Sequence, residues 1–124
     1  MFYSHWSLIK KKQWPFKYFT PRELASNGNQ SLLIDYDAIS KLEQVRIATG
    51  KPLFINSAYR DDLYNAFIGG SPLSYHVEGK AFDISLKNQN KNNLISICRQ
   101  VGFTGLGVNY KSFLHVDTGH KREW

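Results

Sequence analysis

The stretch that decides the fold of this chain is Ser74-Tyr75-His76-Val77-Glu78-Gly79-Lys80-Ala81-Phe82-Asp83-Ile84-Ser85-Leu86. Its second half alternates apolar and polar residues over 81–86, which is typical of a strand with one buried face, and the alternation turns Asp83 away from the core. Its first half is polar, and Gly79 allows a sharp turn between His76 and the strand. The stretch therefore predicts a turn and a strand that present an imidazole and a carboxylate together.

A second pair of strands is predicted nearer the C-terminus, over 103–109 and 111–117. On the last strand His115 and Asp117 share one face, because side chains alternate along a strand. Two imidazoles and two carboxylates can then meet at one edge of a small sheet. Zinc accepts imidazole nitrogen and carboxylate oxygen, and a catalytic zinc site has three protein ligands and an open position. His76, Asp83 and His115 are the candidate ligands.

Helices are predicted on either side of these strands. A threonine cap, a proline and a glutamate form a capping box over 20–25, and apolar residues recur at helical spacing over 35–50 and 92–102, each ending at a glycine. The segment 52–60 is predicted as a buried strand with Arg60 at its end. The segment 61–79 lacks periodicity and is predicted as a loop, where functional residues are often found.

The composition is that of a globular protein. The chain has 124 residues, of which 42% are hydrophobic and 15% aromatic, and this length predicts one domain over 1–124. No apolar run approaches the roughly 20 residues that span a bilayer, so no membrane span is expected. No secretory signal is visible, and we expect synthesis in the cytoplasm. The single cysteine, Cys98, is predicted to be a core residue.

The positive charge indicates a polyanionic partner. A net charge of +6 and a pI near 9.5 suit either nucleic acid or an anionic cell wall. Charge alone does not choose between them. A nucleic-acid module is the weaker alternative, because the sequence has no helix-turn-helix, no paired-cysteine zinc finger and no aromatic RNA-binding signature. We expect no nucleic-acid partner.

Two motifs resemble a known family. All five fixed positions of residues 74–83 match the SxHxxGxAxD motif of the M15 family of zinc D-Ala-D-Ala peptidases. Residues 113–119, with Arg122 and Trp124, look like the last motif of the family's small cell-wall peptidases, and residues 57–60, Asn65 and Gly69-Gly70 fit the same pattern. The resemblance implies zinc held by His76, Asp83 and His115. It also implies a compact single α+β domain with a small antiparallel sheet flanked by helices, as in hedgehog and D-Ala-D-Ala peptidases.

Catalytic roles follow from the resemblance less directly. Many relatives place a catalytic Glu or Asp three positions before the last histidine, where this chain has Ser112. Asp117 lies on the same strand face as His115, and we expect it to be the general base, with Glu78 as its rival. Arg60 is expected to stabilise an oxyanion or to hold a substrate carboxylate. Ser74 is expected either to position substrate or to brace its turn.

The expected function is hydrolysis of peptide bonds in peptidoglycan stem peptides, as an endopeptidase or a D,D-carboxypeptidase. A phage-encoded lysis enzyme (an endolysin) or a bacterial enzyme fits the pattern, acting at the cell wall or in the periplasm once released. The alternative from another class is a non-catalytic, zinc-stabilised module of a phage or cell-surface assembly. A monomer is the default expectation.

Overall fold

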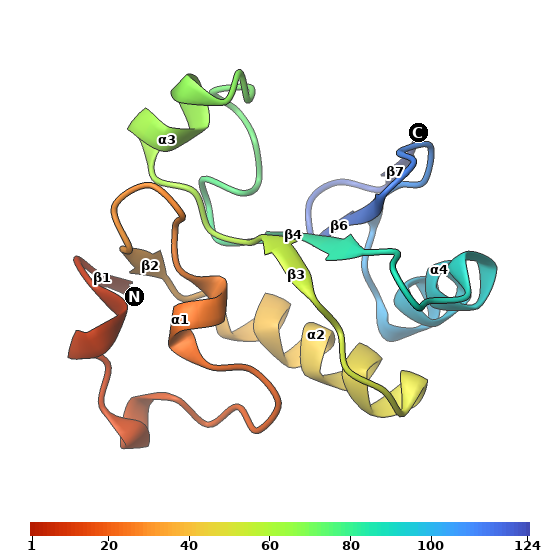
Figure 1. The fold of residues 1–124 in the computed structure, drawn as a ribbon, viewed down its shortest axis with the longest axis horizontal. Helices are drawn as coiled ribbons and strands as arrows, with labels where there is room; N and C mark the ends of the chain where they lie inside the picture. Colours follow the sequence, from red (N-terminus) through yellow and green to blue (C-terminus); the bar gives the residue numbers. More distant parts are fainter.

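The computed structural model describes residues 1–124 and places a five-stranded sheet at the centre of the molecule, with strand order β3-β4-β6-β5-β7 (Figure 1). The strands are β3 (Ile55–Ser57), β4 (Ala81–Ser85), β5 (Gly105–Gly107), β6 (Phe113–Asp117) and β7 (Arg122–Glu123). Neighbouring strands are antiparallel except β5 and β7, which are parallel. The expected α+β fold is confirmed, and the parallel pair arises because β7 turns back from β6 and pairs with the far side of β5.

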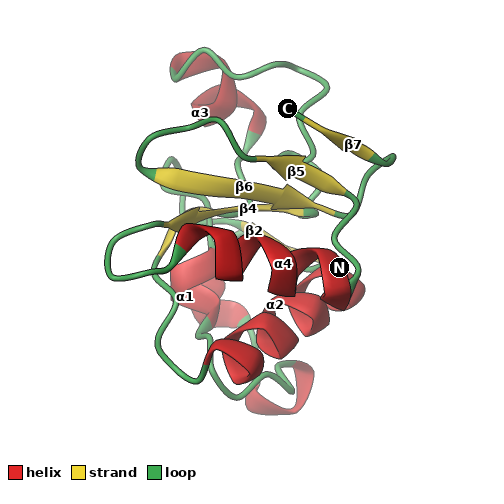
Figure 2. Cartoon of the chain, turned by 90° about the vertical axis from the view of Figure 1, so that its right-hand side faces the viewer, coloured by secondary structure: helices red, strands yellow, loops and turns green.

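Two amphipathic helices cover one face of this sheet. They are α2 (Tyr36–Thr49) and α4 (Lys91–Val101), and Figure 2 shows both below the strands. The side chain of Asp35 accepts a hydrogen bond from the Ala38 amide at the start of α2, and Gly50 ends the helix with a φ of 69°. Both helices match the ranges predicted from the sequence. The short helix α1 (Pro21–Leu24) begins with the predicted capping box at Thr20.

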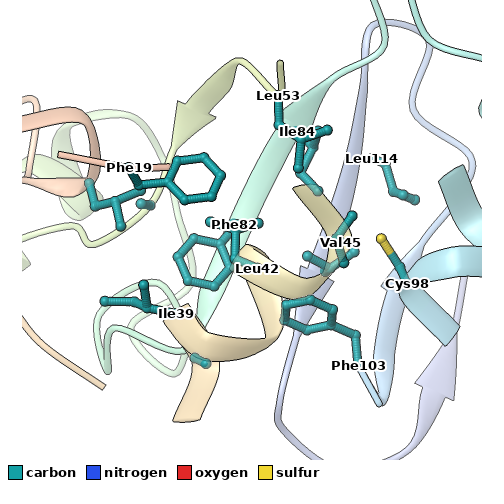
Figure 3. Close-up of a cluster of buried hydrophobic side chains, with 14 of the residues drawn as sticks. Phe19, Ile39, Leu42, Val45, Leu53, Phe82, Ile84, Cys98, Phe103 and Leu114 are labelled. Carbon is teal, nitrogen blue, oxygen red and sulfur yellow. The ribbon is translucent and has the colours of Figure 1, made fainter. Parts of the chain in front are cut away.

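The core lies between the sheet and the helices. Strand β4 contributes Phe82 and Ile84, which alternation had placed on its apolar side, and both are buried (Figure 3). The Cys98 side chain is fully buried, and burial raises the pKa of its thiol to about 12. The prediction that Cys98 is a core residue is confirmed. The opposite face of β4 and β6 is therefore free to carry polar side chains.

The structure differs from the sequence prediction in three regions: segment 52–60, segment 61–79 and the N-terminus. The strand β3 covers only Ile55–Ser57 of the predicted 52–60, and none of its three residues is buried. Helix α3 (Asp62–Phe67) lies in the segment predicted as loop. The sequence does not predict this helix because it has no apolar stripe. Leu63 and Phe67 are 85% and 86% exposed, and the buried residue of the helix, Asn65, is polar. A two-stranded sheet of β1 (Phe2–Tyr3) and β2 (Leu32–Leu33) and two 3₁₀ turns, η1 (Trp6–Leu8) and η2 (Lys11–Gln13), were also not predicted. None of the helices is long and apolar enough to cross a membrane.

Candidate functional site

Three potential metal ligands meet on the face of the sheet that points away from α2 and α4. Asp83 on β4 and His115 on β6 are direct cross-strand partners, and His76 reaches them from the turn before β4. Asp83 Oδ1 lies 3.2 Å from His76 Nε2 and 3.0 Å from His115 Nδ1. One ligand atom of each residue lies within 4.8 Å of the others. The structure thus brings together the three residues that the sequence singled out.

The hydrogen bonds behind the two imidazoles orient their lone pairs. His76 Nδ1 donates to the backbone carbonyl of Ala58 at 2.6 Å, since a carbonyl only accepts. His115 Nε2 lies 2.7 Å from Asp117 Oδ2, a carboxylate, and donates to it in the same way. The remaining nitrogens, His76 Nε2 and His115 Nδ1, then turn their lone pairs toward Asp83. This use of the outer nitrogen is typical of metal-binding histidines.

The three converging atoms fit a zinc ion by their chemistry and spacing. Two neutral imidazole nitrogens and one carboxylate oxygen are all acceptors, so they repel one another unless a cation or a shared proton lies among them. Ligand atoms about 2.0–2.1 Å from a tetrahedral zinc are separated by about 3.3 Å, close to the two separations at Asp83 Oδ1. Burial alone would raise the pKa of Asp83, but the close approach of the His115 and His76 side chains holds it well below its usual range. Asp83 is therefore a carboxylate.

The turn that carries His76 is held by its own backbone. The Arg60 amide donates to the His76 carbonyl at 3.1 Å, which ties the turn to the end of β3. Ser74 Oγ accepts a hydrogen bond from the His76 amide at 3.2 Å, and this bond braces the turn. Ser74 also lines the cleft described below. Gly79 has a φ of 73°, and a side chain there would strike the Leu33 carbonyl. The sharp turn predicted at Gly79 is confirmed.

Asp117 lies behind His115, away from the other ligands. Its side chain has no exposed surface. Each carboxylate oxygen accepts two hydrogen bonds. Oδ1 accepts from Arg122 Nη1 at 3.0 Å and from the Gly119 amide at 2.9 Å. Oδ2 accepts from Arg122 Nη2 at 2.8 Å and from His115 Nε2. Burial alone would raise the pKa of Asp117, but these bonds hold it well below its usual range. The same carboxylate and Asp83 raise the pKa of His115 against the effect of its burial.

A cleft of about 530 Å³ opens over the three converging side chains. Its walls include Tyr75, Tyr110, His120 and Trp124, which sequence reasoning did not assign to the site. Trp124 is 37% exposed, and its ring centroid lies 5.1 Å from that of His115. Its indole donates to the Tyr110 hydroxyl at 2.9 Å. One of these residues had a signal in the sequence, because the aromatic Tyr75 stands directly before the motif histidine His76.

Comparison with known proteins identifies the family of this chain. A family model described as Peptidase M15 matches residues 17–117. The chain belongs to the M15 peptidase family. This agrees with the resemblance found in the two motifs, and the match covers both strands that carry Asp83 and His115.

Two curated relatives of this M15 chain carry functional names. The zinc D-Ala-D-Ala carboxypeptidase of Streptomyces albus G is 35% identical over 89 residues, which is 68% of this chain and 35% of that protein. The peptidoglycan L,D-endopeptidase MepK of Escherichia coli K12 is 28% identical over 95 residues, which is 72% of this chain and 52% of that protein. This chain therefore aligns with about half or less of each relative's length.

Asp117 of the M15 chain, which the sequence predicts to be the general base, is fully buried and does not line the cleft. A base must reach the proton it removes, and a buried carboxylate that already accepts four hydrogen bonds has no free direction toward the cleft. Sequence alternation placed Asp117 on the correct strand face, but it could not show that Arg122 and Gly119 close over it. The rival Glu78 is exposed, lies 3.9 Å from Lys80 Nζ and does not line the cleft.

Arg60 of the M15 chain lies at the cleft beside a candidate ligand. Its Nη2 donates to Asp83 Oδ2 at 3.1 Å, and its Nε donates to Ser57 Oγ at 2.9 Å. A third bond, from Nη1 to Asn65 Oδ1, is 3.3 Å long. A guanidinium has five N–H groups, so two remain free for a substrate oxygen. The expected role of Arg60 is compatible with this position.

Proposed function

We propose that this chain is a zinc peptidase that hydrolyses peptide bonds in the stem peptides of bacterial peptidoglycan, with His76, Asp83 and His115 as the zinc ligands. The observation that carries the proposal is the convergence of three acceptor atoms at the floor of a cleft, in a chain that belongs to a peptidase family. Both named relatives support the substrate class, since one name specifies D-Ala-D-Ala and the other peptidoglycan. The net charge of +6 suits an anionic wall, and we propose that the chain acts there.

Zinc bound by these ligands would polarise a scissile carbonyl and lower the pKa of a water molecule. Asp117 is proposed to position His115, because it holds the outer nitrogen and thereby fixes the ring. Arg60 is proposed to donate its free N–H groups to the carbonyl oxygen or to a terminal carboxylate of the substrate. Ser74 is proposed to hold the turn of His76 and to meet the substrate at the cleft wall.

The proton carrier must be sought elsewhere, because no unpaired carboxylate lines the cleft. We assign this role to His120. It is exposed at the cleft wall, its Nδ1 lies 3.2 Å from the Tyr75 hydroxyl, and its Nε2 makes no hydrogen bond within the chain. When Nδ1 donates to the Tyr75 hydroxyl oxygen, Nε2 carries a free lone pair, which can take a proton from the attacking water and return it to the departing amine.

The function is tested by incubating the zinc-loaded chain with purified peptidoglycan and analysing the released fragments by mass spectrometry. We expect new termini within the stem peptides, whose masses identify the bond that is cut. A chelator should stop their release, and added zinc should restore it. Intact stem peptides after incubation with fully zinc-loaded chain would contradict the proposal.

The lack of a free carboxylate also favours a second candidate, a zinc-stabilised module without turnover in a phage or cell-surface assembly. Under this alternative the chain binds one zinc ion and unfolds when zinc is removed, yet leaves every stem peptide intact. The peptidoglycan digest with parallel measurement of zinc content separates the two candidates.

The positioning role of Asp117 predicts a loss of metal affinity in the Asp117→Asn variant. The amide cannot satisfy both Arg122 and His115, so the ring loses its support, and we expect zinc affinity to fall roughly 10- to 100-fold. Competition with a chromophoric chelator measures the affinity. Asp37→Asn, the same change at a side chain that is 69% exposed, is the matched control. Unchanged zinc affinity together with lost activity would instead restore Asp117 as the base.

A further inference from the structure

A second groove lies outside the proposed active site, in the N-terminal segment. It has a volume of about 560 Å³, close to that of the cleft over the zinc ligands. Its lining includes the aromatic side chains of Trp6, Trp14 and Phe16, together with Ile9 and Lys11. We call it the aromatic groove. In Figure 1 this red and orange part of the chain lies across the molecule from strand β7.

Most of the aromatic groove lies outside the residues that the family model matches. Residues 1–16 precede the family match, which begins at residue 17, and they supply most of the groove. The proposed hydrolysis uses none of these residues. The proposed hydrolysis therefore does not account for the partly exposed aromatic side chains of the groove.

The rings of the groove are fixed in place yet remain partly exposed. Trp14 donates from its indole to the Phe19 carbonyl at 2.7 Å, and its ring meets Phe16 edge to face at 4.9 Å between centroids. The Arg22 guanidinium lies 5.6 Å from the ring of Trp6. Both tryptophans pack against the core on one side only. Rigid, half-exposed aromatic faces of this kind offer flat apolar surface at low entropic cost, and sugar rings have matching apolar faces.

Positive charge is concentrated around the groove. Residues 1–22 contain five Lys or Arg side chains and no Asp or Glu: Lys10, Lys11, Lys12, Lys17 and Arg22. The three consecutive lysines are all exposed, and Lys11 lines the groove itself. Such a surface attracts a polymer that carries regularly spaced negative charges.

We propose that the aromatic groove binds the glycan strand of peptidoglycan, with sugar rings against the aromatic side chains and carboxylates against the lysines. Every second sugar of that strand carries a lactyl group, which ends either in a carboxylate or in an acidic stem peptide. The choice of this polymer rests on the proposed function, because it is the strand to which the proposed substrate is attached. The groove then holds the wall while the cleft acts on a stem peptide.

The test uses glycan strands from which the stem peptides have been removed, so that the chain cannot cut its ligand. Binding is measured by the change in tryptophan fluorescence during titration. We expect Lys11→Glu to weaken binding roughly tenfold, as for loss of one important interface contact. Lys87→Glu, an equal charge change on an exposed lysine in the β4–α4 loop, should leave the affinity unchanged. Trp6→Leu should weaken binding without adding charge, and circular dichroism checks that it folds.

A second arm separates this proposal from the proposed function. Cleavage of a short soluble stem peptide should be equal in the parent chain and in Lys11→Glu, whereas cleavage of intact peptidoglycan should be slower in the variant. A chain that binds glycan but cuts no stem peptide would refute the proposed function and leave the groove in place. Glycan affinity that is unchanged in both Lys11→Glu and Trp6→Leu would overturn the groove proposal. The groove proposal would also be overturned if the chain does not bind glycan but binds phosphatidylglycerol vesicles, or if it does not bind glycan but self-associates in light scattering.

Discussion

The His115→Ala variant is expected to lose both its zinc and its peptidase activity. His115 supplies one of three converging acceptor atoms, and its removal leaves His76 and Asp83, two ligands where a catalytic zinc site has three. It also removes the hydrogen-bond partner of the buried Asp117 carboxylate. Zinc per chain, measured by mass spectrometry of the metal after dialysis, should fall from one to near zero, and activity on peptidoglycan should fall to the assay background.

The control for this variant is His5→Ala. His5 lies at the start of η1, where its Nδ1 accepts from the Ser7 amide, and it does not line the cleft. This variant should keep one zinc per chain and full activity. Stoichiometric zinc in dialysed His115→Ala would show that His115 is not a ligand, and activity without zinc would refute the zinc peptidase itself.

The His120→Gln variant is expected to keep its zinc and to lose most of its turnover. General acid–base catalysis by a positioned side chain contributes roughly 10²–10⁴-fold, so kcat should fall by about that factor while KM changes little. The Tyr75 hydroxyl lies 3.2 Å from His120 Nδ1, and the Arg122 guanidinium donates to the His120 carbonyl.

Two further variants make the assignment of His120 specific. His5→Gln, the same change outside the cleft, should leave kcat unaltered. Tyr75→Phe removes the hydroxyl that lies 3.2 Å from His120 Nδ1, and kcat should fall by less than in His120→Gln because the imidazole itself remains. If His120→Gln turns over at the parental rate, another group carries the proton.

Local sequence determined much of the fold and the composition of the proposed metal site. The alternation over 81–86 decided that Asp83 faces away from Phe82 and Ile84, because successive side chains on a strand point to opposite faces. Helical spacing and the terminal glycines fixed α2 and α4 in the same way. These features depend only on neighbours along the chain, and the structure agrees with them. The motif resemblance then identified the histidines that belong with Asp83.

Tertiary structure alone decided what each polar residue meets. The sequence places His115 and Asp117 on one strand face, but it does not show that Arg122 and the Gly119 amide donate hydrogen bonds to the buried Asp117 carboxylate. Helix α3 has no apolar stripe from which the sequence could predict it. The cleft brings together Tyr75 and His120, which are 45 residues apart in the sequence. Periodicity reports which way a side chain points, whereas burial and hydrogen bonding depend on segments that only folding brings together.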